Sequence, residues 1–275
     1  MKLQLLAATA VVALSASASS AMAQSADWTG GYVGGHIGYA FQPDDGNETI
    51  LFDKNLDGVF TDTVTTAAGA DAFSPGFCGG SANGSTPATG CGKDDDGVDF
   101  GLRAGYDWQM TSGLVLGVVA EVSKPDIEDS VAAFSTTPAF YTMTREVDWM
   151  GAIRGRAGFA MDRYLPYVTA GLARAKVDTG FATSNTANTF VLSGDDNVSG
   201  YQLGAGVETK VTPNWSVGVE YLYTNLDDDD FRVRAQGPAP ATNPFILTNA
   251  SGTDFARSDD EFDSHSVRVT AAYRF

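Results

Sequence analysis

The chain has few basic residues, few cysteines and few histidines. Its 275 residues hold 17 Lys plus Arg against 34 Asp plus Glu, for a formal charge of −17, with only two Cys and two His. A protein that binds the phosphate backbone of a nucleic acid needs clustered Lys and Arg. This composition therefore argues against nucleic acid as a partner. Only 19% of residues are charged while 31 are Gly, which does not fit a coiled coil or helical bundle. The 43% hydrophobic content argues against a disordered acidic protein.

Long apolar runs are missing after the first residues. Lys2 precedes an apolar stretch, and the small-residue pattern Ala21-Met22-Ala23 follows it before Gln24. This is the pattern of a cleaved signal peptide, which we assign to residues 1–23. No later segment has the roughly eighteen consecutive apolar residues of a spanning helix. The exported chain, 24–275, is therefore expected to stay soluble or to enter the outer membrane of a Gram-negative cell as a barrel.

The exported chain alternates between two kinds of sequence. Gly- and aromatic-rich segments with period-2 hydrophobicity fall at 28–41, 97–110, 114–123, 145–161, 165–177, 197–211, 215–226 and 262–275. Polar connections without a period join them, and the long ones are 42–96, 124–144, 178–196 and 227–261. Tight turns alternate strictly with these long connections, which is typical of a transmembrane barrel with short periplasmic turns. The fold class predicted is all-β: an eight-stranded antiparallel up-and-down transmembrane barrel with four long extracellular loops.

The two faces of the segments support this reading. In 97–110 the apolar face includes Phe100 and Leu102, while the other carries Asp99 and Arg103 between glycines. Small and charged residues suit the narrow lumen of a barrel whose apolar face contacts lipid. Strict alternation in 145–161 places Val147 and Trp149 together on the lipid face and Asp148 in the lumen. Segment 165–177 fits least well, because its two charged residues share a face with apolar ones; we assign Arg174 and Lys176 to the lumen with the other charges.

The charges assigned to the lumen nearly balance, which predicts an ion-pair network that plugs the barrel. Buried charges need partners, because an unpaired one is costly. The residues expected at the centre of the network are Glu121, Arg154, Arg156, Glu208, Glu220 and Arg268. An eight-stranded lumen is just wide enough for side chains to fill, so a plug is favoured over a pore. The alternative is a charged constriction in a narrow passive channel for small solutes.

Several motifs resemble the small outer-membrane β-barrel surface proteins of alphaproteobacteria. They are Trp28-Thr29-Gly30-Gly31-Tyr32-Val33-Gly34-Gly35, Arg154-Gly155-Arg156-Ala157-Gly158-Phe159, Pro213-Asn214-Trp215-Ser216 and the closing His265 to Phe275. The resemblance covers most of the wall and none of the long loops. It implies an eight-stranded barrel related in architecture to the OmpA membrane domain, with a structural, antigenic or porin-like role and no enzymatic one. In the last strand, Tyr273 and Phe275 resemble the signal read by the barrel assembly machinery.

Two groups of residues in the first long connection carry separate hypotheses. Cys78 and Cys91 bracket a Gly- and Ser-rich stretch of an exported chain, so we expect a disulfide that closes a surface loop. Asp53, Asn55 and Asp57 precede Gly58 with the spacing of the first half of a calcium loop. The twelfth position is Val64, so the bidentate Glu is missing and any calcium bound there is held weakly. No other cofactor is expected.

The two histidines give no sign of catalysis. His36 falls on the first strand and points inward by alternation, whereas His265 falls on the last and points outward, which argues against a shared metal. Ser266 follows His265 directly, but adjacent strand residues face opposite ways and cannot form a nucleophile–base pair. No enzymatic activity is expected.

The sequence therefore predicts a structural surface protein of the outer membrane. Its acidic loops would support envelope integrity and surface interactions. Expected partners are outer-membrane lipid and lipopolysaccharide, the barrel assembly machinery and an extracellular partner that the sequence does not identify. A soluble periplasmic ligand-binding barrel is a second alternative, and it requires the apolar face to point inward.

Overall fold

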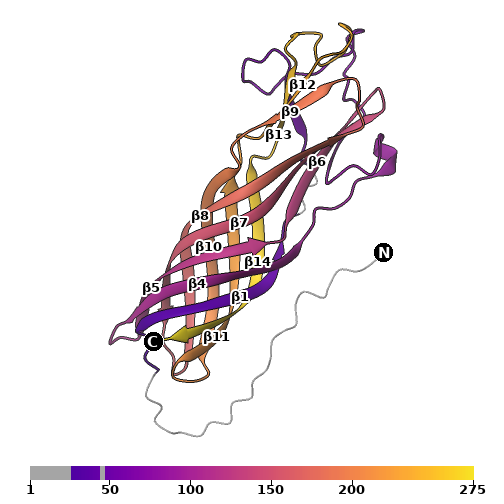
Figure 1. Cartoon of the computed structure of the whole chain (residues 1–275). Coiled ribbons are helices and arrows are strands. Elements are labelled where there is room, and N and C mark those ends of the chain that lie inside the picture. Colours follow the sequence, from indigo (N-terminus) through magenta and orange to yellow (C-terminus); the bar gives the residue numbers. More distant parts are fainter. Residues whose placement is uncertain (1–25, 44–46) are drawn as a thin grey trace.

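A computed structural model of the chain describes residues 26–43 and 47–275 (Figure 1). The predicted signal peptide, 1–23, lies outside these residues. The closed eight-stranded antiparallel barrel is confirmed, with β1 paired to β14 on one side and β4 on the other. Its strands are β1 (Gly30–Phe41), β4 (Gly97–Gln109), β5 (Leu114–Pro125), β7 (Ala139–Phe159), β8 (Tyr164–Thr183), β10 (Asn197–Lys210), β11 (Trp215–Asp227) and β14 (Glu261–Arg274). No helix in the described part of the chain is long and apolar enough to cross a membrane.

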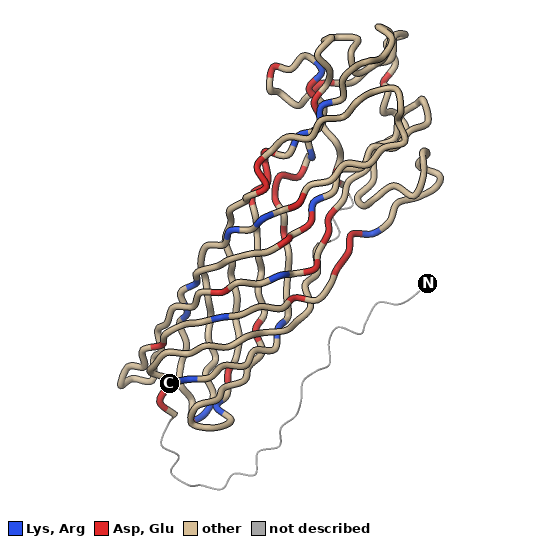
Figure 2. Tube along the Cα trace, viewed as in Figure 1, with Lys and Arg blue, Asp and Glu red and all other residues tan. Residues whose placement is uncertain are grey.

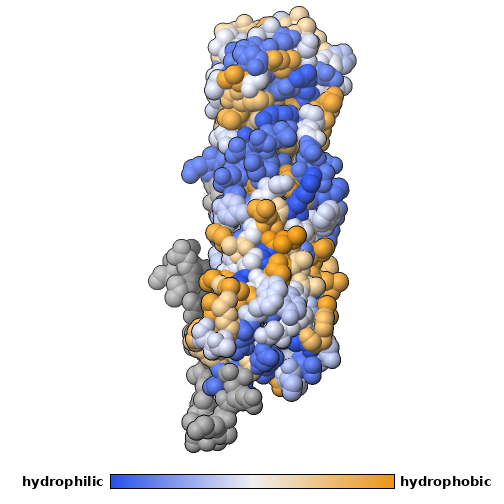
Figure 3. Space-filling model, turned by 90° about the vertical axis from the view of Figure 1, so that its left-hand side faces the viewer, coloured by the Kyte–Doolittle hydropathy of each residue, from blue (hydrophilic) through white to orange (hydrophobic). Residues whose placement is uncertain are grey.

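The wall of the barrel has its apolar side chains outside. On β4, Leu102 is 75% exposed and Phe100 is 53% exposed, while Asp99 and Asp107 are fully buried inside. Aromatic side chains lie near the tight-turn end of the wall, where Trp215 packs against Tyr273 with ring centroids 5.5 Å apart. Hydrophobic side chains gather over the barrel in Figure 3, below a hydrophilic band. This polarity excludes the soluble alternative, because a soluble barrel buries its apolar face.

A β-bulge in β7 corrects the predicted orientations of Val147 and Asp148. The register against β8 shifts between Val147 and Trp149, leaving Asp148 as the additional residue. Val147 is consequently buried and Trp149 is 43% exposed, so their predicted common face is wrong. Asp148 lies outside the lumen, where it meets two lysines at the surface.

The assignment of Arg174 and Lys176 to the lumen is also wrong. On β8 the buried side chains at this level are Ala173 and Ala175, whereas Arg174 is exposed and Lys176 is partly exposed. Their apolar neighbours Val168 and Leu172 are on the same outer face, nearer the middle of the wall. The change from apolar to charged residues along one outer face therefore marks where β8 leaves the apolar belt.

The long connections fold into a body that we call the cap, comprising residues 47–96, 126–146, 178–196 and 228–260. A four-stranded sheet in the cap has the order β2 (Ile50–Asp53), β13 (Thr253–Arg257), β12 (Arg232–Gln236) and β9 (Thr189–Ser193). The barrel sheet also continues into the cap, where β6 (Glu128–Ser135) lies between β7 and β3 (Gly76–Gly79). Figure 1 shows the cap at one end of the barrel. The sequence predicted these regions only as loops.

The cap has an aromatic core to which every long connection contributes. Phe73 stacks on Phe52 at 4.4 Å between ring centroids, and both contact Phe255, which is fully buried. Tyr141 from β7 and Phe190 from β9 also contact the ring of Phe255. Segments distant in sequence thus share one apolar interior, which makes the cap a cooperative unit.

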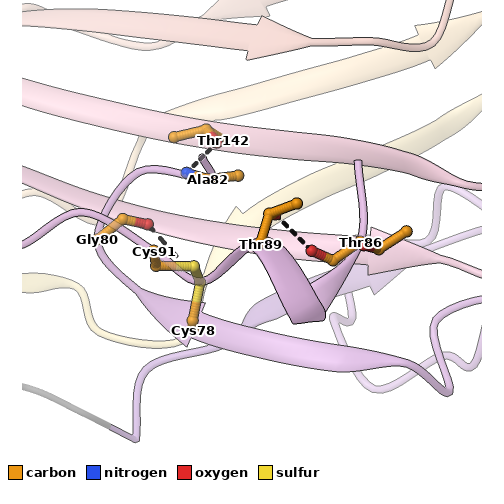
Figure 4. Close-up of a disulfide and its surroundings, with 7 residues drawn as sticks. All are labelled: Cys78, Gly80, Ala82, Thr86, Thr89, Cys91 and Thr142. Atoms are coloured by element: carbon orange, nitrogen blue, oxygen red, sulfur yellow. Dashed lines mark hydrogen bonds between the residues drawn. A yellow bond between two sulfur atoms is a disulfide. The ribbon is translucent and has the colours of Figure 1, made fainter. Parts of the chain in front are cut away.

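The predicted disulfide is present in the cap and joins Cys78 to Cys91 (Figure 4). Cys78 belongs to β3 and is opposite Ala132 of β6. The bridge closes a loop that contains the short 3₁₀ helix η1 (Pro87–Thr89). Ala82, within the closed loop, donates its backbone N–H to the hydroxyl of Thr142 on β7 at 3.4 Å. The disulfide therefore fastens this loop beside the strands that extend from the barrel.

Candidate functional site: a closed lumen

The lumen is filled by two clusters of charged side chains, one near the middle of the barrel and one near the tight-turn end. Figure 2 shows acidic and basic positions interspersed along the barrel strands. Inward glycines leave room for the backbone of a neighbouring strand or for a large side chain. A Cβ at Gly34 would approach the carbonyl oxygen of Ala271 at 2.1 Å, and one at Gly105 would approach the Tyr32 hydroxyl at 2.4 Å.

The middle cluster pairs three arginines with three carboxylates. Arg154 donates to Glu121 at 3.0 Å and to Glu220 at 3.3 Å, which joins β7 to β5 and β11. Arg268 from β14 donates to Glu121 and Asp99, each at 2.5 Å. Arg103 donates to the second oxygen of Glu220 at 3.2 Å.

Neutral polar groups complete the middle cluster. Gln202 accepts a hydrogen bond from Arg154 at 2.6 Å, and the Tyr167 hydroxyl donates to Glu220 at 2.7 Å. His36 lies 3.4 Å from Asp99 and 3.7 Å from Glu121. Because all these side chains are buried and drawn from strands around the whole barrel, the cluster ties opposite walls together.

The cluster at the tight-turn end pairs two arginines with two carboxylates. Arg156 donates to Glu208 at 2.8 Å and lies 3.0 Å from Asp107. Arg274 donates to the remaining oxygens of both acids, at 2.8 and 2.9 Å. The Arg274 guanidinium also lies 4.7 Å from the ring centroid of Trp28, which is fully buried at the entrance. These contacts close this end of the lumen with a charge-balanced layer beside an aromatic ring.

Above the middle cluster, the inside of the barrel becomes apolar. Its buried residues at this level are Ala40, Ile127, Val147, Met150, Ala152, Ala173, Ala175, Val177, Val198, Leu226 and Phe262. The layer spans several strands and separates the charged lumen from the cap. An ion moving along the axis would have to leave both water and the charged groups to cross it, which is unfavourable.

A third charged group lies between this apolar layer and the cap core. Arg257 forms a two-point contact with Glu48 at 2.6 and 2.7 Å and also donates to Asp129 at 2.9 Å. Arg145 donates to Asp129 at 2.7 Å and lies 3.7 Å from Asp228. These five residues, which we call the junction cluster, have three carboxylates for two guanidiniums.

Because the junction cluster has one more carboxylate than guanidiniums, the pKa values of its three acids shift in different directions. Burial is the largest influence on each of them and favours the protonated form. Asp129 nevertheless has a lowered pKa because Arg257 and Arg145 both act on it. Burial raises the pKa of Glu48 to about 7, since Arg257 only partly offsets it. Burial also raises the pKa of Asp228. The cluster therefore favours binding a proton near neutral pH.

The structure places the six residues expected at the centre of the lumen network in two groups. Glu121, Arg154, Glu220 and Arg268 belong to the middle cluster, whereas Arg156 and Glu208 belong to the one at the tight-turn end. The six omit Asp99, Arg103, Asp107 and Arg274, which supply the remaining charges. All four occupy inward positions by simple alternation, so the signal for them was in the sequence.

The two histidines are apart and have different surroundings. His36 is in the lumen, as alternation indicated. His265 lies on the outer face, where its Nδ1 is 2.7 Å from the Tyr221 hydroxyl. Ser266, next to His265, is buried on the opposite face of β14. The geometry thus offers no contact between the histidine and the adjacent serine hydroxyl.

The residues of the calcium hypothesis form a compact turn. Asp53 is buried, and its carboxylate accepts backbone N–H bonds from Leu56 at 2.6 Å and Gly58 at 2.7 Å. The Asn55 amide donates to Asp57 at 3.0 Å. Within residues 26–43 and 47–275, no group of three or more His, Cys, Asp or Glu is arranged to hold a metal. Calcium binding at this turn stays a prediction.

The residues of the expected assembly signal lie at the end of the last strand. Tyr273 is 41% exposed on the outer face, and Phe275 is 73% exposed. The Phe275 backbone N–H donates to the Gly31 carbonyl at 3.0 Å, which fixes the end of the chain against β1. Both side chains are accessible from the lipid side of the wall. Their recognition by the assembly machinery stays a prediction.

The family model and the sequence relatives that match this chain are outer-membrane proteins. A family model described as outer membrane protein beta-barrel domain matches residues 7–275. The 31 kDa outer-membrane immunogenic protein of Brucella melitensis is 28% identical over 274 residues, covering 98% of this chain and 93% of that protein. The 22 kDa outer membrane protein of Rhizobium leguminosarum bv. viciae is 32% identical over 142 residues, covering 51% and 59%. The crystal structure of OprG from Pseudomonas aeruginosa aligns with a TM-score of 0.46 at 11% identity, covering 91% and 99%.

Proposed function

The chain belongs to the outer membrane protein β-barrel domain family, and from this premise we propose that it is a surface scaffold with a closed lumen. It is an outer-membrane protein of a Gram-negative cell. The observation that carries the proposal is the succession of closed layers along the axis. Two charged clusters, an apolar layer, the junction cluster and the aromatic cap core follow one another, and each is made of buried side chains.

The cap is the functional surface in this proposal. It presents the four long connections as one folded body, so a partner would meet a defined shape. The relative from Brucella melitensis is named as an immunogenic outer-membrane protein, which supports surface exposure of this cap as well. We assign the barrel a role in envelope integrity and the cap a role in contact with an extracellular partner. No enzymatic role is proposed.

Planar-bilayer conductance tests the closed lumen. The mature chain, purified as a folded monomer with heat-modifiable gel mobility, should give no discrete openings in potassium chloride. Discrete and reproducible openings would contradict the proposal and support the narrow channel. In that case Glu121→Gln should change ion selectivity, because Glu121 is in the middle cluster, while the cap variant Asp71→Asn should not.

A further inference from the structure

The lipid-facing wall has a hollow on one side of the barrel. It has a volume of about 680 Å³ and lies across β5, β7, β8 and β10. Its floor includes Ala120 and Gly151, and its walls include Trp149 and Ile153 of β7 and Leu172 and Arg174 of β8. Ile153 and Leu172 are directly opposite each other in the β7–β8 register. Both side chains are largely exposed, so they form a ridge that bounds the hollow on the side away from the cap.

The fold itself does not require glycine at the floor of this hollow. A Cβ at Gly151 would have its nearest contact at 3.6 Å, with the Trp149 ring, which is ordinary van der Waals spacing. Its φ is not in the left-handed region. The inward Gly171 differs, since a Cβ there would meet the Ile153 carbonyl oxygen at 2.0 Å. Gly155 on the same strand is equally unconstrained and lines a second hollow of about 650 Å³, but the lining of that second hollow includes no exposed Lys or Arg. The feature that distinguishes the hollow at Gly151 is therefore the charge at its edge.

Cations surround the cap end of the hollow. Among the described residues of the barrel strands, the exposed Lys and Arg side chains near the cap are Lys124 on β5 and Arg174 and Lys176 on β8. The opposite side of the barrel has Asp227, Glu261 and Asp263 at the cap ends of β11 and β14. The exposed Lys and Arg side chains at the cap end of the wall thus lie beside the hollow, together with the carboxylates of Asp148 and Asp178.

Arg174 is the cation available to a ligand. Lys124 and Lys176 lie 3.3 and 3.5 Å from Asp148, and Lys176 also lies 2.7 Å from Asp178. Arg174 has no hydrogen bond and no ion pair within 4.0 Å among the described residues, and its charge contributes only the smallest part of the lowered pKa of the exposed Asp195. It is opposite Gly151 in the register, and it lines the hollow itself. A guanidinium at the edge of an apolar hollow matches a phosphate attached to an acyl chain.

We propose that this hollow binds an acyl chain of lipid A, the membrane anchor of lipopolysaccharide, with its phosphate on Arg174. This inference rests on the proposed function in one respect: the cap is taken to be on the extracellular side, so that the hollow faces the outer leaflet, where lipid A is the phosphorylated lipid. The apolar part of the hollow contacts the chain, Trp149 covers the level where chain and headgroup meet, and Arg174 contacts the phosphate. This inference does not depend on whether the lumen conducts.

Native mass spectrometry of the folded mature chain tests the proposal. The protein in detergent is titrated with lipid A and, separately, with phosphatidylglycerol. One lipid A should be retained per chain in preference to phosphatidylglycerol. Arg174→Gln should weaken lipid A retention about tenfold, the effect expected for loss of one hydrogen-bonded charge. Gly151→Leu should weaken it similarly by filling the hollow.

Two matched variants separate this site from general lipid contact. Gly155→Leu adds the same side chain to β7 beyond the ridge, where it fills the second hollow, which has no exposed Lys or Arg in its lining. Arg163→Gln removes an exposed cation at the tight-turn end. Both should retain lipid A as the wild type does, and all four variants should keep the heat-modifiable gel shift. Retention unchanged in Gly151→Leu or Arg174→Gln would overturn the proposal, as would equal retention of phosphatidylglycerol.

Discussion

The barrel and the cap of this molecule have opposite interiors. The lumen buries five arginines with five carboxylates in its two clusters, whereas the cap core is built from rings such as Phe73, Tyr141 and Phe255. One chain, folded continuously, therefore encloses two bodies held together by different forces. The junction cluster and the apolar layer next to it mark the transition between them.

The surroundings of each body explain the difference. The cap is in water, so burying aromatic surface gives a large favourable free energy. The wall of the barrel is in lipid, where apolar side chains gain little by turning inward. The barrel instead keeps apolar groups outside and draws its strands together with directional, charge-assisted hydrogen bonds. Such pairs are stabilising in a closed lumen only while every partner is present.

The largest effect should follow from removing one partner in the lumen. Arg154→Met removes one of the three arginines that contact Glu121 and Glu220, leaves one more carboxylate than guanidiniums in the middle cluster, and should lower the free energy of unfolding by about 3–5 kcal/mol. Urea unfolding in lipid vesicles, followed by tryptophan fluorescence, measures this loss. Val168→Ala on the outer wall is the control and should have a small effect. A loss under about 1 kcal/mol for Arg154→Met would show that the ion pairs do not hold the barrel.

A similar substitution in the cap should act locally. Phe255→Ala removes the ring at the centre of the aromatic core and should destabilise the cap by about 3–5 kcal/mol. Hydrogen exchange should accelerate in β12 and β13, while the barrel keeps its heat-modifiable gel shift. Leu247→Ala, at a 40% exposed position, should leave exchange unchanged. If Phe255→Ala also abolished the gel shift, the two bodies would be one cooperative unit.

Removing the disulfide should weaken the cap somewhat less. The double variant Cys78→Ser/Cys91→Ser frees a short loop and should lower the stability of the cap by about 3 kcal/mol through the entropy of the unfolded chain. Limited proteolysis should then cut between residues 79 and 90 faster than in the wild type. A cleavage rate equal to that of the wild type would mean that β3 and the Ala82–Thr142 contact hold the loop alone.

The smallest effect concerns pH and the junction cluster. The folded state raises the pKa of Glu48 to about 7, above its ordinary value, so it binds this proton more tightly than the unfolded chain does. The contribution of Glu48 therefore favours the cap most at acidic pH and is lost as pH rises through about 7. Glu48→Gln should flatten this dependence and stabilise the cap at pH values above the raised pKa. Hydrogen exchange of β13 amides measures it, with the exposed Asp71→Asn as control. A pH dependence unchanged in Glu48→Gln would contradict this assignment.

The barrel could be predicted from the sequence because its rules are local. Alternation along β4 is enough to turn Asp99, Arg103 and Asp107 inward and Phe100 outward, and the lengths of the connections set the topology. Which acid each arginine meets could not be predicted. The Arg154–Glu220 contact, for example, joins strands that are not neighbours and depends on how the barrel closes.

The cap escaped prediction for a different physical reason. Its strands are short, as in β2 and β12, and their partners come from connections far apart in sequence. Phe73 lies among small and polar residues with no period that would mark it as a core residue. The inward assignment of Arg174 failed because charge was taken as a sign of the lumen. On β8 that charge marks instead the level at which the wall leaves the lipid.

The bulge at Asp148 lets β7 change which residues face inward. Side chains alternate between the two faces of a strand, so one extra residue changes the inward positions from even to odd residue numbers. Below it, β7 turns Arg154 and Arg156 inward on even numbers. Above it, odd numbers turn Tyr141, Met143 and Arg145 inward. One strand can thus serve an ionic interior and an aromatic interior in turn. Deletion of Asp148 would join Val147 to Trp149 in regular alternation and remove the bulge, whereas deletion of a regularly paired residue such as Ala152 would reverse the faces on one side of it.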